Sequence, residues 1–197
     1  MNSSARPRVG VLAIQGDYAA HAEALAETGA EPIEVRKPNQ LVDLDGLILP
    51  GGESTTMLKF FEKNNFFEAL RTFGSTRPVF GTCAGAILLA REVTHPPQRS
   101  LGLLDATVER NAYGRQIDST ILRSETSLPG GPLEMVFIRA PRIVQIGEGV
   151  QVLARREGFP TLVCQGKLMA ATFHPELSQD RRVHRLFVEA VRDGVSI

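Results

Sequence analysis

Short, almost continuously apolar runs alternate with helical patterns along the first half of the chain. Residues 8–14, 46–49 and 78–82 form such runs, which are typical of parallel strands buried on both faces of a sheet. A shorter run at residues 32–35 predicts another strand. Helical spacing predicts helices over residues 18–28, 57–64, 66–73 and from residue 84 onward. This alternation indicates right-handed crossovers and therefore a parallel sheet.

The second half of the chain has a different pattern, in which short strands follow one another with Gly, Pro or charged turns between them. We predict these strands at residues 103–108, 120–123, 133–138, 143–146, 150–154 and 161–164. Another apolar strand covers residues 168–173, and helical spacing predicts a closing helix over residues 180–192. We therefore expect an α/β fold with an open, mostly parallel sheet flanked by helices and antiparallel additions in the C-terminal half.

Composition limits what else the chain can be. With 197 residues, 43% of them hydrophobic, the chain is long enough for one full core, so we expect a single domain over residues 1–197. Lys plus Arg and Asp plus Glu balance at 22 each, which argues against nucleic acid or an anionic membrane surface as the main partner. The two cysteines have no second Cys or His at metal-ligand spacing, and no stretch resembles a signal peptide or membrane span. We expect a cytoplasmic protein without a metal or cofactor.

One of the cysteines, Cys83, lies at the junction of a predicted strand and a predicted helix. The sequence around it is Gly-Thr-Cys-Ala-Gly, and small residues permit the sharp strand-to-helix turn that presents a nucleophile to a cleft. The helix N-terminus there favours a thiolate. A buried structural cysteine is the alternative that this segment alone leaves open. Cys164 lies inside a predicted strand, where we expect it to pack as a buried side chain.

A pair of glycines, Gly51 and Gly52, directly follows another predicted strand. Ligands bind at the carboxyl ends of strands in open α/β sheets, and adjacent glycines let backbone N–H groups approach an oxyanion. Ser54 would cap the helix that follows. Taken alone, this segment is better explained as an ordinary glycine turn before a capped helix.

Two further segments carry side chains suited to chemistry. His174 and Glu176 follow the predicted strand at residues 168–173, and in an extended chain residues two apart point to the same side. With Cys83, they would supply the nucleophile, the base and the orienting carboxylate that acyl transfer needs. Arg110 and Arg115 lie in a small loop that would suit a carboxylate, although a solvated turn explains that loop better when it is taken alone.

Together, these segments resemble the class I (triad) glutamine amidotransferases, and within them the glutaminase subunits of pyridoxal phosphate synthase. The cysteine turn and the His-Pro-Glu sequence at residues 174–176 mark the superfamily. Gln-Gly-Asp at residues 15–17, Gly-Gly-Glu-Ser-Thr-Thr at residues 51–56 and Ile-Arg-Ala-Pro at residues 138–141 point to the particular family. The matching segments span nearly the whole chain.

The resemblance implies a flavodoxin-like fold and hydrolysis of L-glutamine to L-glutamate and ammonia, which a synthase subunit in a large hetero-oligomer uses to make pyridoxal phosphate. It implies that Cys83 forms a glutamyl thioester, that His174 moves the protons and that Glu176 holds His174. Backbone N–H groups of Gly52 and Ala84 would bind the oxyanion. The implied glutamine site consists of Gly51, Gly52, Glu53, Arg110, Ile138 and Arg139, with Arg110 pairing with the α-carboxylate.

We also expect Gln15 to lie beside the glycine turn, at the same edge of the sheet, and to take part in activation by the synthase subunit. A flip of the Gly51–Gly52 peptide would remove an oxyanion donor in the free subunit, and docking of the synthase near Gln15 would order the turn. The remaining histidines, His21, His95 and His184, have no partner nearby in sequence, so we expect surface or helix-face roles for them.

Two other functions are compatible with the sequence. The chain could supply ammonia to a synthase of a histidine, purine or tryptophan pathway. It could also be a binding module that has kept the fold without the activity, with Cys83 holding a ligand or sensing oxidants. The intact set of Cys83, His174 and Glu176 argues against the binding module.

Overall fold

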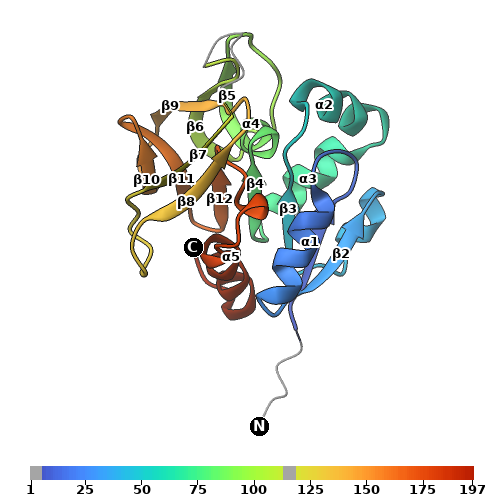
Figure 1. The fold of residues 1–197 in the computed structure, drawn as a ribbon. Coiled ribbons are helices and arrows are strands. Elements are labelled where there is room, and N and C mark those ends of the chain that lie inside the picture. The colour runs from blue at the N-terminus through green and yellow to red at the C-terminus, as the bar shows by residue number, and fades with distance from the viewer. Residues whose placement is uncertain (1–5, 113–118) are drawn as a thin grey trace.

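Five parallel strands form the centre of the structure, a computed structural model that describes residues 6–112 and 119–197 (Figure 1). They are β1 (Arg8–Leu12), β2 (Glu31–Val35), β3 (Gly46–Leu49), β4 (Val79–Thr82) and β12 (Leu168–Ala171). Their spatial order is β12-β4-β3-β1-β2. Antiparallel to β12, β11 (Phe159–Gln165) and then β10 (Gln151–Arg156) extend the sheet. The predicted fold, a mostly parallel sheet with antiparallel additions, is confirmed.

Helices cover both faces of this sheet. α1 (Tyr18–Glu27) and α5 (Arg182–Asp193) lie on one face, and α2 (Ser54–Lys63), α3 (Phe66–Gly74) and α4 (Ala84–Leu89) lie on the other. Successive strand residues point to opposite faces, so neighbours in one strand join different cores. Val11 packs in the core with α1 and α5, whereas Leu12 packs in the core with α2, α3 and α4.

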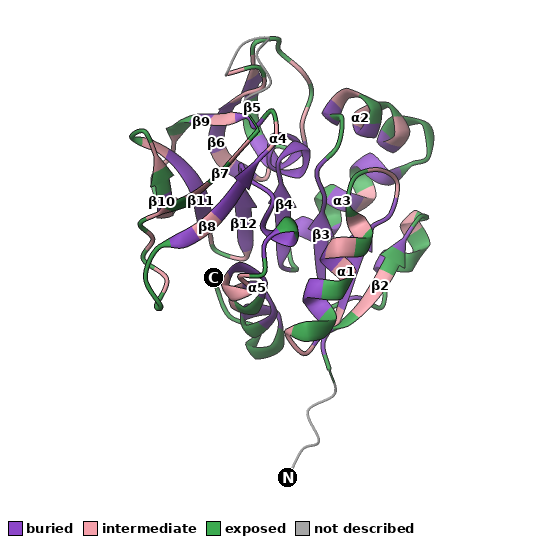
Figure 2. Ribbon diagram, viewed as in Figure 1, coloured by how far each residue is buried: buried purple, intermediate pink, exposed green. Residues whose placement is uncertain are grey.

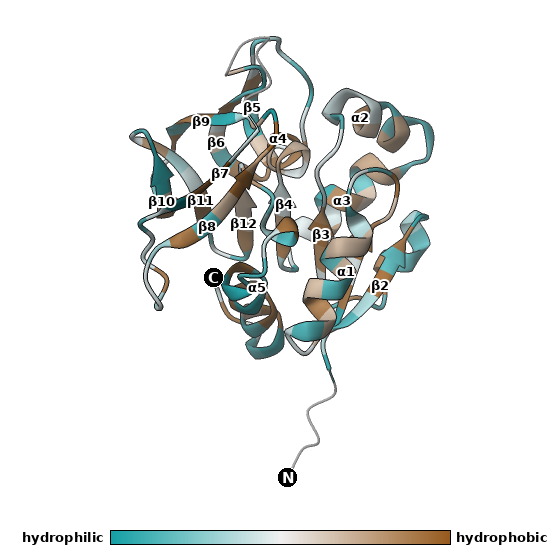
Figure 3. Cartoon of the chain, in the orientation of Figure 1, coloured by the Kyte–Doolittle hydropathy of each residue, from teal (hydrophilic) through white to brown (hydrophobic). Residues whose placement is uncertain are grey.

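The burial of the central strands explains their composition. β3, β4 and β12 are buried at every position, and they are purple throughout in Figure 2. A strand covered on both faces needs a continuous apolar run and not an alternating one. Figure 3 shows a related contrast in hydropathy, because β3 and β12 are largely brown whereas much of α5 is teal.

Two smaller sheets lie beside the main one. β5 (Ala90–Thr94), β6 (Leu104–Glu109) and β9 (Arg142–Ile146) form one sheet, and β7 (Thr120–Ser124) and β8 (Leu133–Phe137) form the other. β5 was not predicted from the sequence. Its charged residues Arg91 and Glu92 are exposed, and its pairing partner β6 lies beyond a loop, so the local pattern carries little strand signal.

The start of α2 differs from the prediction. Glu53, and not Ser54, is the N-cap residue, and its carboxylate accepts a hydrogen bond from the backbone N–H of Thr55 at 3.0 Å. Ser54 lies inside the first turn, where its hydroxyl donates to Gln98 at 3.0 Å. The predicted Ser54 cap is therefore wrong, because the helix begins earlier than the apolar spacing indicates. No helix in the described ranges is both long and apolar enough to cross a membrane.

Candidate active site

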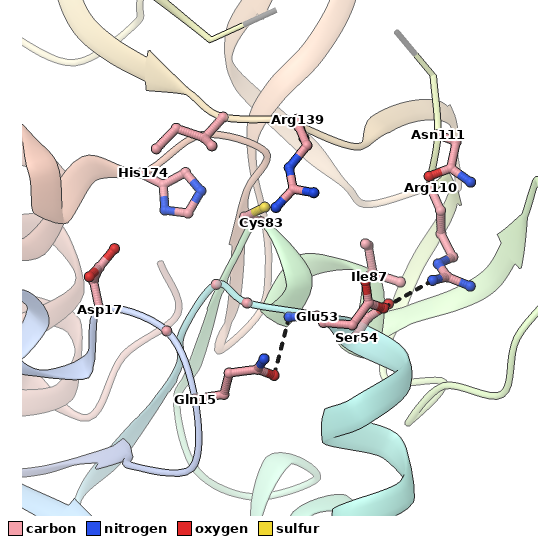
Figure 4. Close-up of a pocket in the computed structure, with 14 residues that line it drawn as sticks. Gln15, Asp17, Glu53, Ser54, Cys83, Ile87, Arg110, Asn111, Arg139 and His174 are labelled. Atoms are coloured by element: carbon pink, nitrogen blue, oxygen red, sulfur yellow. Dashed lines mark hydrogen bonds and ion pairs between the residues drawn. The ribbon is translucent and has the colours of Figure 1, made fainter. Parts of the chain in front are cut away.

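The carboxyl ends of four neighbouring strands meet at one edge of the main sheet. The segments that follow β12, β4, β3 and β1 carry His174, Cys83, Gly51 and Gln15, respectively. All four residues line one cavity of about 350 Å³ (Figure 4). This volume falls at the lower end of the range of small-ligand pockets, about 300–1000 Å³. Convergence of strand ends explains why residues so far apart in sequence share this cavity.

The predicted glutamine-binding residues also line this cavity. They are Gly51, Gly52, Glu53, Arg110, Ile138 and Arg139. Glu176 is 4% exposed and lies behind His174. Arg115, the second arginine of the predicted carboxylate loop, lies outside the described residues. Figure 4 shows the Cys83 sulfur, the His174 ring and the Arg139 guanidinium turned toward the same part of the cavity.

Cys83 occupies the sharp turn that the sequence predicts. Its backbone has φ +49°, a value that residues with a side chain rarely adopt. Its backbone N–H donates to the carbonyl of Ala171 at 2.8 Å. A Cβ at Gly85 would come within 1.9 Å of the Leu49 carbonyl oxygen, and one at Gly81 within 2.5 Å of the Gly85 backbone. Small residues are therefore needed here because α4 packs directly on β4 and β3.

His174 and Glu176 are hydrogen-bonded to each other. His174 Nδ1 lies 2.7 Å from Glu176 Oε1, and the two side chains are 8% and 0% exposed. The backbone between them differs from the prediction, because residues Pro175–Leu177 form a 3-10 turn and not an extended strand. The tight turn brings the carboxylate back onto the ring, so the predicted pairing holds with a different local geometry.

The environment of His174 favours its charged form. Burial opposes the charge, but hydrogen bonds to Cys83 and Glu176 and the negative charges of both outweigh it and raise the pKa of His174 to about 10. With Nδ1 bonded to Glu176, the other ring nitrogen is available to Cys83. This arrangement stabilises the imidazolium form of His174 next to the Cys83 sulfur.

Gln15 holds the glycine turn in place. Its side-chain oxygen accepts a hydrogen bond from the backbone N–H of Glu53 at 3.2 Å, drawn as a dashed line in Figure 4. Gly16, at φ +77°, lies so close to Gly51 that a Cβ would come within 2.1 Å of the Gly51 carbonyl oxygen. The N–H of Gly52, on the opposite side of the same peptide, therefore points away from Gly16. The predicted proximity of Gln15 and the glycine turn is confirmed.

Charged side chains cluster at the far end of the cavity. Arg110 Nη2 lies 3.3 Å from Glu53 Oε1, and hydrogen bonds from Thr55, followed by the charges of Arg110 and Arg139, lower the pKa of Glu53. Arg110 Nε is buried and has no hydrogen-bond partner in the part of the chain that the structure describes. The cavity therefore offers both a carboxylate and guanidinium donors to a zwitterionic ligand.

Surface or helix-face roles were expected for His21 and His184, and both lie on buried helix faces. His21 of α1 and His184 of α5 are both 0% exposed, and they contact each other behind Glu176. His95 is exposed, as predicted. Helical periodicity could have revealed the burial, because His21 lies four residues before buried Leu25 and His184 lies three residues before buried Phe187.

The hydrogen bond between His174 and Glu176 limits metal binding at this site. Asp17, His174 and Glu176 each offer one ligand atom, and these atoms lie within 4.8 Å of one another. Because His174 Nδ1 and Glu176 Oε1 already bond to each other, we assign both atoms to that hydrogen bond and not to a metal. Cys164 is buried in β11, and burial raises the pKa of its thiol, which fits the predicted structural role.

The fold and the site together define a class: open α/β proteins in which a cysteine, a histidine and a glutamate meet at adjacent strand ends. The family model described as the SNO glutamine amidotransferase family matches residues 11–193, and the chain belongs to this family.

Similar proteins agree with this assignment. The chain is 59% identical over 189 residues to the pyridoxal 5′-phosphate synthase subunit PdxT of Koribacter versatilis, covering 96% of this chain and 98% of the relative. It is 55% identical over 187 residues to the subunit of the same name from Solibacter usitatus, covering 92% and 97%. A solved structure described as a glutamine amidotransferase is 49% identical, has a TM-score of 0.86, and covers 93% of this chain and 98% of that one.

Proposed function

We propose that this chain is the glutaminase subunit of a pyridoxal phosphate synthase, and that it acts in the cytoplasm within a hetero-oligomer. It hydrolyses L-glutamine to L-glutamate and ammonia and passes the ammonia to a synthase subunit. The observation that carries the proposal is the meeting of Cys83 and His174, the latter bonded to Glu176, at the wall of a cavity that also holds Arg110 and Glu53. The names of the relatives support the pathway, and the two unpaired cysteines fit a reducing compartment.

The charged end of the cavity suits the backbone of a free amino acid. Arg110 and Arg139 would bind the α-carboxylate, and Glu53 would bind the α-ammonium group. The position of Arg110 in the cavity wall supports this role, since a guanidinium offers paired N–H donors to a carboxylate. The side-chain amide of glutamine would then extend toward Cys83.

The first half of the reaction forms a thioester. The Cys83 thiolate attacks the amide carbon, and the carbonyl oxygen becomes an oxyanion. Ala84 N–H is a candidate donor to the oxyanion because the N–H of Cys83 is bonded to Ala171, and Gly52 N–H is a second candidate because it points away from Gly16. When the tetrahedral intermediate collapses, the C–N bond breaks and His174 gives its proton to the departing ammonia.

In the second half of the reaction, His174 acts as a base and not as an acid. Neutral His174 takes a proton from water, the resulting hydroxide attacks the thioester carbon, and the C–S bond breaks to release glutamate and the Cys83 thiolate. Glu176 holds the ring through Nδ1 in both halves of the reaction. No oxidant or cofactor enters this balance.

The test is glutamate release by the chain mixed with a pyridoxal phosphate synthase subunit. We expect Cys83→Ala to lower the rate at least about 10³-fold, because the nucleophile has no substitute. Cys164→Ala is the matched control and should retain activity. An electrophilic glutamine analogue should label Cys83 alone, as peptide mass spectrometry would show. Substantial turnover by Cys83→Ala would refute the mechanism.

A further inference from the structure

Behind the cavity, one oxygen of Glu176 lacks an evident partner. Oε1 bonds to His174, but Oε2 is buried and has no aligned hydrogen-bond partner in the described chain. His21 Nε2 lies 3.3 Å from this oxygen and 3.1 Å from the hydroxyl of Thr82. A buried carboxylate oxygen without a donor is costly, so the nearby imidazole is the group to which this oxygen would turn.

His21 is in turn held by a second histidine. Its Nδ1 lies 3.0 Å from Nε2 of His184, and neither side chain reaches solvent. His184 Nδ1 is buried and has no hydrogen-bond partner in the described chain. The contacts therefore form a line that runs from α5 through α1 to the glutamate behind the proposed base.

The neighbours of the two rings determine which nitrogens carry protons. If His21 carried its proton on Nδ1, its bare Nε2 would face the carboxylate oxygen, and His184 Nδ1 would be a buried N–H without an acceptor. If His184 Nε2–H donates to His21 Nδ1, then His21 Nε2–H donates to the Thr82 hydroxyl oxygen with Glu176 Oε2 3.3 Å from the same nitrogen, and His184 Nδ1 needs no acceptor. The second arrangement leaves neither ring with a buried N–H that lacks a facing acceptor.

Both rings are held neutral. Burial lowers the pKa of His21 well below 6.5, and His184 and His174 add to this effect. Burial also lowers the pKa of His184 to about 3, with a further contribution from Arg181. The other ionisable groups near this line are Asp17 before α1, Cys83 after β4, and Glu27, which pairs with Arg181.

We propose that His21 and His184 are positioning residues, a neutral relay that gives Glu176 its second hydrogen-bond donor and thereby fixes the carboxylate that orients His174. This inference rests on the proposed glutaminase function and deepens it. Because Glu176 supports the charge on His174, the relay acts on the imidazolium of His174 from behind the cavity. It touches neither substrate nor the reacting atoms.

The test compares His21→Leu with His21→Gln in the complex with the synthase subunit. Leucine removes the donor, whereas the glutamine amide places an N–H near the position of ring Nε2, and both residues favour helices. We expect His21→Leu to lower kcat about tenfold or more with little change in KM, and His21→Gln to recover most of the loss. His95→Gln, at an exposed histidine, is the control and should match wild type.

A second readout separates positioning from packing. We expect the rate of Cys83 alkylation by iodoacetamide to reach half its maximum at a higher pH in His21→Leu, and at the wild-type pH in His21→Gln. A packing defect alone would lower the rate without moving this midpoint. Adding His184→Leu to His21→Leu should cost nothing further, because His184 acts only through His21.

The wild-type protein gives a measurement that needs no variant. Long-range proton–nitrogen NMR correlations should show neutral rings with the proton on Nε2 in both His21 and His184. A proton on Nδ1 of His21, or a folded His21→Leu variant with unchanged kcat and alkylation midpoint, would overturn the relay. Absence of glutaminase activity in wild type would instead refute the proposed function.

Discussion

The backbone of Cys83 is held in a conformation that favours glycine, with φ +49° and ψ −104°. Positive φ at a residue with a side chain costs about 1–3 kcal/mol, and such strain gathers at functional sites. Arg139, which lines the same cavity, also has a positive φ of 45°. The strain at Cys83 keeps the thiol at the cavity wall, and it is maintained by the packing of α4 against β3 and β4.

This strain predicts an unusual stability order at position 83. We expect Cys83→Gly to be more stable than Cys83→Ala by about 1 kcal/mol, because relief of strain exceeds the entropy cost of glycine. Urea denaturation of the two inactive variants measures the difference. If the alanine variant proves the more stable one, the backbone at this turn is not strained.

The raised pKa of His174 makes the stability of the fold depend on pH. Its folded pKa of about 10 lies above the ordinary value of 6.5, so the folded state binds the proton more tightly than the unfolded state. The resulting stabilisation is complete below pH 6.5 and is lost as pH rises from 6.5 to about 10.

Relative to His174→Gln, the free energy of unfolding of wild type should therefore decrease across this pH window, by at most about 1.4 kcal/mol per pH unit. Urea denaturation at several pH values between 6 and 10 would test this. Parallel curves for the two proteins would mean that the Cys83 and Glu176 contacts do not stabilise the imidazolium.

At the scale of elements, the close contact between α4 and β3 determines the stability effect of a substitution at Gly85. Alanine normally stabilises a helix relative to glycine, by about 1 kcal/mol. At Gly85, however, a Cβ would come within 1.9 Å of the Leu49 carbonyl oxygen. We expect Gly85→Ala to be destabilising by about 2 kcal/mol or more, because backbone must move.

Gly74, at the end of α3, is the matched control. A Cβ there would come within 2.5 Å of Leu103 Cδ1, the end of a flexible side chain that can rotate away. Gly74→Ala should therefore cost less than Gly85→Ala in thermal or urea unfolding. Equal losses would show that α4 can move away from β3.

The elements themselves differed in how far the sequence predicted them. The apolar runs that became β1, β3, β4 and β12 were predicted because burial on both faces imposes a local pattern. β5 escaped prediction because its stability comes from pairing with β6 and not from its own residues. The N-cap of α2 is Glu53 and not the predicted Ser54, because the local apolar pattern does not locate the first helical turn.

In the candidate site, too, features with a local sequence pattern were predicted and those that depend on packing were not. Cys83, His174 and Glu176 were predictable because turn chemistry and strand ends leave marks in the sequence. The buried contact between His21 and His184 was not predicted, because it depends on where α1 and α5 cross behind β4. Helical periodicity can place each histidine on an apolar helix face, but their contact with each other follows only from the packing of α1 against α5.

At the scale of the whole molecule, the described contacts predict how a partner would act. We expect the synthase subunit to raise the glutaminase rate of wild type, mainly through kcat, and Gln15→Ala to lose most of this stimulation. The reason is that Gln15 holds the peptide after Gly52, and loss of one oxyanion donor costs about 10²–10³-fold.

Steady-state kinetics of both proteins with and without the synthase subunit would decide this. Equal wild-type rates in the two conditions would contradict activation by the partner. Undiminished stimulation of Gln15→Ala would remove this residue from the activation.

The helix α1 and the loop before it support the active site at two points. The loop before it holds the glycine turn through Gln15, and its second turn brings His21 to Glu176. A shift of α1 against the sheet would therefore disturb both the Gly52 oxyanion donor and the Glu176 carboxylate that holds His174. Independent losses in rate multiply, so two tenfold losses would combine to about a hundredfold. Because both supports depend on α1, the rate should be more sensitive to the position of this helix than it would be with either support alone.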